Sequence, residues 1–267
     1  MVRTFFGMEY DPFAPQSDKA GCFVSQDFNQ ATARLEHLRE LRGIGLFTGH
    51  PGSGKTAVVR NWAAGLNPGL FKAVYLPMSS VSTMEFYRSL CLGLGLEPKY
   101  KKIDMFHDIQ QRIATLHKEK KTTPVLILDE AQYLRPDTLN DLKLILNFDM
   151  DSKAYAILIL MGLPVLGAVL SRKHHEALAQ RIVMNYSFQG LARSEAEPYL
   201  VSRLKAAGVL EPVFESGAVE AIFAASNGSV RHLNALASKA LLLAAQKQTR
   251  RISSDLILAV RDDMALA

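Results

Sequence analysis

Apolar residues follow two different periods along this chain. Between residues 26 and 190, short apolar runs typical of buried strands alternate with segments whose apolar residues recur every three or four positions, which is typical of helices. The predicted strands are residues 44–48, 71–76, 125–128, 155–161 and 182–188, and the predicted helices are residues 26–41, 56–64, 83–94, 105–118 and 136–147. This alternation predicts an α/β fold with three layers, in which helices cover both faces of a parallel sheet.

After residue 190 only the helical period remains. The predicted helices are residues 194–207, 216–226, 229–246 and 253–265, separated by turns that contain Gly208 and Gly228. The chain is therefore expected to have an irregular lead-in (1–26), an α/β core (27–190) and a small all-α domain (191–267).

The composition is that of an ordinary soluble protein, with 48% hydrophobic and 21% charged residues. The net charge of +5 favours a polyanionic partner such as nucleic acid, but it is also unremarkable for 267 residues, and both interpretations stay open. The two cysteines, Cys22 and Cys91, form no disulfide framework and no metal-ligand spacing, which predicts a reducing, cytoplasmic compartment. The most apolar run, residues 154–170, is short and contains Gly162 and Pro164, so no membrane span or membrane partner is expected.

A glycine-rich loop follows the first predicted strand and opens a predicted helix. It fits the pattern G-x-x-x-x-G-K-[ST] and reads Gly49-His50-Pro51-Gly52-Ser53-Gly54-Lys55-Thr56, followed by Ala57. Glycines let the backbone curl so that its N–H groups point at phosphate oxygens, and the helix presents its positive end to the same anion. In such a loop Lys55 reaches the terminal phosphates and the Thr56 hydroxyl binds Mg²⁺. The segment from Gly49 to Ala57 is therefore predicted to bind ATP.

Two carboxylates, Asp129 and Glu130, directly follow the predicted strand 125–128. The carboxyl ends of parallel strands are where ligands bind in an open sheet. Asp129 is therefore predicted to hold Mg²⁺, and Glu130 to polarise the water that attacks the γ-phosphate. Together with the glycine-rich loop, the pair predicts an ATPase.

Several motifs resemble those of one known family. They are Phe5-Phe6-Gly7, Asp11-Pro12-Phe13, Leu128-Asp129-Glu130-Ala131-Gln132, Leu178-Ala179-Gln180-Arg181-Ile182 and Gly228-Ser229-Val230-Arg231-His232-Leu233-Asn234. With the phosphate loop, they make nearly the whole chain similar to AAA+ ATPases of the ExeA type and to the ATPase partners of DDE transposases, such as TniB, TnsC and MuB.

The resemblance implies roles for three further positions. Arg231 would reach the γ-phosphate from the all-α domain, called the lid in this family. Arg181 would be an arginine finger inserted into a neighbouring subunit's site, with Arg172 as the alternative. The family often has a polar residue where Leu163 stands, so either hydrolysis is slow or another group takes over its role. A finger in turn implies a homo-oligomer, either a hexamer-like ring or a helical filament.

Three functions remain open from the sequence. The first is an ATP-dependent regulator of transposition that assembles on double-stranded DNA and recruits a DDE transposase. Candidate DNA contacts for it are Lys99, Lys101, Lys102, Arg172 and Lys173, although each cluster is also explained as a solvated loop. The second is a secretion-associated ATPase, which the sequence disfavours because no membrane span follows the lid. The third is a slow, nucleotide-gated protein adaptor.

Overall fold

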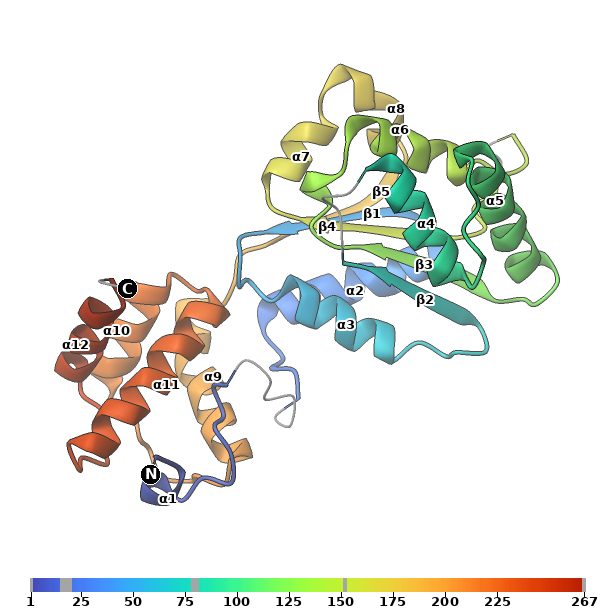
Figure 1. Ribbon diagram of the computed structural model, residues 1–267. Helices are drawn as coiled ribbons and strands as arrows, with labels where there is room; N and C mark the ends of the chain where they lie inside the picture. The colour runs from blue at the N-terminus through green and yellow to red at the C-terminus, as the bar shows by residue number, and fades with distance from the viewer. Residues whose placement is uncertain (1, 15–20, 78–81, 151–152, 266–267) are drawn as a thin grey trace. The chain divides into compact units, whose positions relative to one another are not determined.

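The computed structural model describes residues 2–14, 21–77, 82–150 and 153–265 (Figure 1). Residues 1 and 15–20 of the predicted lead-in lie outside the described part. The chain divides into two compact units. The helical unit comprises Met1–Asn29, His50–Gly54 and Gln189–Ala267, and the core unit comprises Gln30–Gly49 and Lys55–Phe188.

The core unit contains a five-stranded parallel sheet with the strand order β2-β3-β4-β1-β5, which confirms the predicted α/β fold (Figure 1). The strands are β1 (Gly43–Gly49), β2 (Phe71–Leu76), β3 (Thr123–Leu128), β4 (Ile157–Gly162) and β5 (Ile182–Phe188). Every residue of the internal strands β3 and β4 is buried, whereas burial alternates along β5. The expectation that β5 is a buried strand is wrong because β5 lies at the edge of the sheet.

The register of the strands determines which residues meet at the edge where the strands end. Leu128 pairs with Leu76 on one side and with Leu160 on the other, and Thr48 pairs with Gly162. The residues that follow β1, β3 and β4 therefore emerge at the same edge of the sheet.

Helices cover both faces of this sheet, with α2 and α3 on one face and α4 to α8 on the other (Figure 1). Their bounds are α2 (Gln26–Leu41), α3 (Lys55–Ala64), α4 (Thr83–Leu94), α5 (Lys102–Lys118), α6 (Pro136–Ile145), α7 (Val165–Leu170) and α8 (Glu176–Ala179). Helix α5 begins at Lys102, earlier than its apolar pattern predicts. Two short 3₁₀ turns, η2 (Ala131–Tyr133) and η3 (Lys173–His175), complete the unit.

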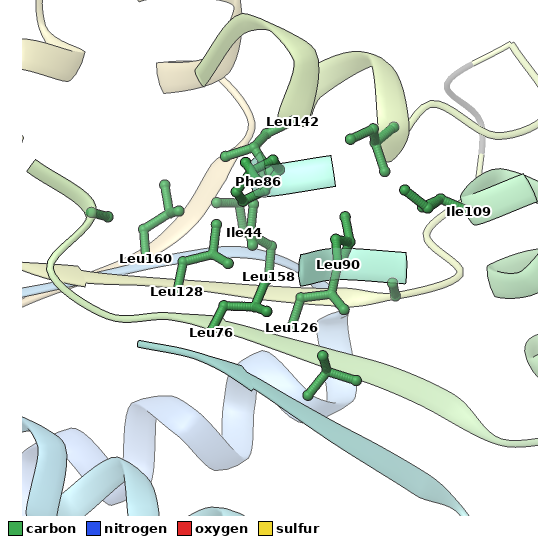
Figure 2. Packing of buried hydrophobic residues seen from close by; sticks show 14 of the residues in the cluster. Ile44, Leu76, Phe86, Leu90, Ile109, Leu126, Leu128, Leu142, Leu158 and Leu160 are labelled. Carbon is green, nitrogen blue, oxygen red and sulfur yellow. The ribbon is translucent and has the colours of Figure 1, made fainter. Parts of the chain in front are cut away.

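Apolar side chains fill the space between the sheet and helices α4, α5 and α6 (Figure 2). The labelled members of this cluster are Ile44, Leu76, Leu126, Leu128, Leu158 and Leu160 from the strands, and Phe86, Leu90, Ile109 and Leu142 from the helices. Helix α4 is held at both ends. Ser82 and Glu85 form a reciprocal capping box, and Gly95 ends the helix with φ of 76°, a left-handed conformation that suits glycine.

Truncation of the buried face of α4 should destabilise the protein. Leu90 is 0% exposed, so Leu90→Ala is expected to lower the free energy of unfolding by about 2–5 kcal/mol through lost burial and a residual cavity. Leu92 lies on the same helix but is 65% exposed, and Leu92→Ala should change that free energy by less than ~0.5 kcal/mol. Urea titration followed by circular dichroism measures both variants, and equal losses would contradict this orientation of α4.

The helical unit packs four longer helices around a separate apolar core, as the sequence predicts for the C-terminal segment. They are α9 (Arg193–Ala206), α10 (Ser216–Ser226), α11 (Val230–Gln246) and α12 (Ser254–Ala265). Part of the predicted irregular lead-in is helical, as α1 (Val2–Phe6), and Met8 and Phe13 contribute to the core of this unit. No helix in the described ranges is long and apolar enough to cross a membrane.

Candidate active site

The phosphate loop connects β1 to α3, as predicted. Gly52 and Gly54 have φ of 78° and 96°, a region that costs an L side chain strain, so glycine permits the curl of the loop. Lys55 opens α3, is 7% exposed, and its Nζ donates a hydrogen bond of 2.8 Å to the carbonyl of Gly49. The ammonium group is thus held at the end of β1, where the loop begins.

A buried hydroxyl within the loop supports the predicted phosphate site. Ser53 is 7% exposed, and its Oγ has no hydrogen-bond partner in the part of the chain that the structure describes. Burying a hydroxyl without a partner costs free energy, and a phosphate oxygen would satisfy it. The residue types and backbone of the loop therefore fit a bound triphosphate.

Asp129 and Thr56 meet at the C-terminal edge of the sheet. The Thr56 hydroxyl donates to Asp129 Oδ2 across 3.1 Å, and Asp129 is only 5% exposed. A hydroxyl and a carboxylate side by side are hard oxygen ligands of the kind that Mg²⁺ takes, with phosphate and water oxygens completing its shell. No group of three or more His, Cys, Asp or Glu side chains able to hold a metal occurs among the described residues.

Tyr75 is a member of this corner that the sequence did not suggest. Its hydroxyl donates a 2.9 Å hydrogen bond to Asp129 Oδ2 from the neighbouring strand β2. Burial, and then the hydrogen bond to Asp129, raise the pKa of Tyr75 to about 12. The phenol therefore keeps its proton near neutral pH and acts as a hydrogen-bond donor that orients the carboxylate. No local sequence signal could have found it, because the contact depends on β2 being the neighbour of β3.

Glu130 leaves the strand in a left-handed conformation, with φ of 52°. Its backbone N–H donates to Asp129 Oδ1 across 2.9 Å, and its side chain is exposed. Gln132 Nε2 donates to Glu130 Oε2 across 2.6 Å, and the backbone N–H of Leu163 donates to Gln132 Oε1 across 3.0 Å. The carboxylate of Glu130 is thus connected through Gln132 to the end of β4.

Within the helical unit, the start of α11 contacts the tip of the phosphate loop. The backbone N–H of Val230 donates to the carbonyl of Gly52 across 2.9 Å, and the Ser229 hydroxyl donates to the carbonyl of Pro51 across 3.3 Å. A Cβ atom at Gly52 would lie 2.8 Å from the Cβ of Arg231, closer than carbon atoms approach. Arg231 therefore lies beside the loop. Of the other residues predicted to bind nucleotide, His50 is exposed, and Thr56 and Ala57 follow in α3. The γ-phosphate contact of Arg231 stays a prediction.

Arg181 immediately precedes β5, at the sheet edge opposite to that of Asp129. Its Nη1 donates to the carbonyl of Lys143 near the end of α6 across 2.7 Å. Arg172, the alternative finger, is exposed in the turn after α7. The geometry does not select one of them, and the finger stays a prediction.

The lysines predicted to contact DNA are partly neutralised. Lys99 pairs with Asp108 at 2.7 Å, and the hydrogen bond to Asp108 raises the pKa of Lys99. Lys102 pairs with Asp141 at 2.6 Å. Lys101, and likewise Arg172 and Lys173, are exposed. Salt bridges weaken the case for Lys99 and Lys102 as phosphate contacts, because each cation already has a carboxylate partner.

The family model of the AAA domain matches residues 38–170, the segment that carries both nucleotide motifs. Residues 38–170 therefore form an AAA domain, and the chain has the AAA+ fold. Over 100% of its length, the chain is 28% identical to general secretion pathway protein A of Aeromonas hydrophila, and it spans 48% of that protein's length. This relative supports the secretion-associated alternative better than the transposition interpretation.

Solved structures show the same AAA+ fold. Cdc6p from Pyrobaculum aerophilum is 18% identical with a TM-score of 0.70, over 90% of this chain and 67% of that one. The origin recognition complex of Drosophila, solved bound to DNA, gives 17% identity and a TM-score of 0.68 over 96% and 67% of the two chains. RuvB of Thermotoga maritima, a Holliday junction branch migration motor, gives 17% identity and a TM-score of 0.57 over 90% of this chain and 69% of that one. At these identities the likeness concerns the fold alone.

Proposed function

We propose that this AAA+ chain binds ATP with Mg²⁺ and hydrolyses it. The observation that carries the proposal is the contact of Thr56 with Asp129, next to Lys55 and directly before Glu130. Magnesium-dependent release of phosphate from ATP by the purified chain tests it. A rate no higher than that of the heat-denatured chain would refute it.

The chemistry divides among these residues. The loop amides and Lys55 would hold the phosphates, and Thr56 and Asp129 would hold Mg²⁺, which would supply positive charge to the phosphate oxygens. Glu130 accepts a proton from a water molecule whose oxygen attacks the γ-phosphorus, and the bond from that phosphorus to the bridging oxygen breaks, releasing ADP and phosphate. Arg231 from the same chain, and Arg181 from a neighbouring subunit, would stabilise the negative charge that develops.

The biological role that we favour is an ATPase of a secretion pathway, in which nucleotide state controls assembly with other proteins. Its support is the 28% identity to general secretion pathway protein A, which extends over the whole of this chain. A DNA-dependent regulator is the second candidate, and the net charge of +5 with the exposed Lys101, Arg172 and Lys173 favours it.

Nucleotide-driven assembly should separate these roles. With Mg²⁺ and a slowly hydrolysed ATP analogue, we expect sedimentation velocity to show a shift to a larger homo-oligomer without DNA. Assembly that occurs only with duplex DNA and that weakens steeply with salt would favour the DNA-dependent regulator. Tight ATP binding with neither turnover nor assembly would favour the nucleotide-gated adaptor.

A further inference from the structure

The turn after β3 contains a hydrogen-bonded bridge that the ATPase chemistry above leaves unused. It runs from the carboxylate of Glu130 through the side chain of Gln132 to the backbone of Leu163, at the end of β4. We propose that Gln132 is a positioning residue that holds the Glu130 carboxylate in its working orientation. This inference rests on the proposed hydrolysis of ATP.

The bridge uses both the oxygen and the nitrogen of the Gln132 side-chain amide. The N–H of Leu163 can only donate, so the oxygen of the Gln132 amide must face it, 3.0 Å away. The amide nitrogen then faces Glu130 Oε2, 2.6 Å away, where a carboxylate can only accept. The orientation of the amide therefore follows from its partners. Glutamate at this position would lack the donor, and alanine would lack both groups.

Glu130 has few other restraints. Its side chain is exposed, and its left-handed backbone turns it out of the strand. An exposed glutamate samples many rotamers, and only some of them place an oxygen where it can accept a proton from the attacking water. The bond from Gln132 selects among these rotamers.

The end of β4 provides room for this bridge. A Cβ atom at Gly162 would overlap Gln132 Oε1 and would lie 3.0 Å from Leu166 Cδ2. Gly162 is not among the described residues with positive φ, so what glycine provides there is space. Because Gly162 has no side chain, the end of β4 leaves space for the amide of Gln132, which follows the end of β3.

The bridge also bears on Leu163. The Leu163 side chain has no group that can hydrogen-bond to water or phosphate, yet its backbone N–H is connected to Glu130 through Gln132. The Leu163 side chain cannot connect the Glu130 carboxylate to the end of β4. Gln132 therefore makes this connection.

Steady-state kinetics of Gln132→Ala and Gln132→Glu test the proposal. Both should lower kcat about 10- to 100-fold, as expected when a reacting group is misplaced, with KM and the affinity for a fluorescent ADP analogue unchanged. A purely structural role would lower stability or nucleotide affinity together with kcat, whereas misplacement of Glu130 lowers kcat alone.

Gly162→Ala provides an independent route to the same contact. It leaves Gln132 in place but removes room for its amide, so it should lower kcat as Gln132→Ala does. The double variant Gly162→Ala/Gln132→Ala should be no slower than the slower single variant. Gln111→Ala is the matched control, since Gln111 is exposed on α5 and should keep the original kcat.

The outcomes separate the inference from the proposed function. An unaltered chain that does not release phosphate would refute the ATPase function and this inference with it. If the unaltered chain is active and Gln132→Ala keeps its kcat, only the inference fails. If the two substitutions lower kcat multiplicatively in the double variant, they do not act through the same amide, and the inference fails as well. Should Gly162→Ala not fold, the kcat and KM of Gln132→Ala and Gln132→Glu still decide.

Discussion

Glu130→Gln is expected to lower kcat for ATP hydrolysis by about 10²- to 10⁴-fold, the range that a positioned general base contributes. The amide has nearly the same shape as the carboxylate but cannot accept the proton of the attacking water. Affinity for ATP should not fall, because Glu130 lies beyond the Thr56–Asp129 contact that fits the metal. Phosphate release under saturating ATP measures kcat, and titration of a fluorescent ATP analogue measures the affinity.

The matched control is Glu97→Gln, which removes the same charge from an exposed position in the segment between α4 and α5. It should leave both kcat and affinity unchanged. Turnover by Glu130→Gln at the rate of the unaltered chain would contradict its role as the base. A parallel loss of nucleotide affinity would instead indicate that Glu130 contributes to binding.

Lys55→Ala is expected to weaken ATP binding by about 10- to 150-fold, the equivalent of one charge-assisted hydrogen bond. Lys55 is buried and its ammonium bonds to the carbonyl of Gly49, so it is already in place for the terminal phosphates. The variant should therefore lose turnover mainly because it no longer retains nucleotide. Isothermal titration with ATP and Mg²⁺ measures the effect.

Lys120→Ala is the control for net charge, because Lys120 is exposed beyond the end of α5. It should bind ATP as the unaltered chain does. If the two variants bind equally well, the nucleotide lies elsewhere. A thermal melt of Lys55→Ala in the absence of nucleotide should show that the fold persists, so that weak binding is not the result of unfolding.

The local patterns of the chain were sufficient for its five strands, its longer helices and both nucleotide motifs, but not for the short helices α1, α7 and α8. The pattern predicts helix 83–94 with the bounds of α4 and strand 71–76 with those of β2, because helical and strand periods are local properties. Burial of strand 182–188 was not predicted correctly. A run of apolar residues does not reveal whether a strand is internal or at an edge, and in the folded sheet β5 is at the edge.

The contacts around the two carboxylates could not be predicted in the same way. Tyr75 reaches Asp129 because β2 is the neighbour of β3, and Gln132 reaches Leu163 because β4 is the neighbour on the other side. Strand order in a parallel sheet depends on how distant helices pack, and no period along the chain records it. The pairing of Lys102 with Asp141 joins α5 to α6 and depends on how these two helices pack, which no local pattern records.

The sequence by itself determined that this chain has a glycine-rich loop of the pattern G-x-x-x-x-G-K-[ST], an acidic pair after a buried strand, and an α/β core followed by helices. Each of these is written in consecutive residues, so local chemistry and periodicity are enough to recognise it. Only the tertiary structure decided which side chains hold Asp129 and Glu130. Tyr75 reaches Asp129 from β2, and Gln132 is held at its other end by Leu163 after β4, so both arrangements exist only once the sheet has formed.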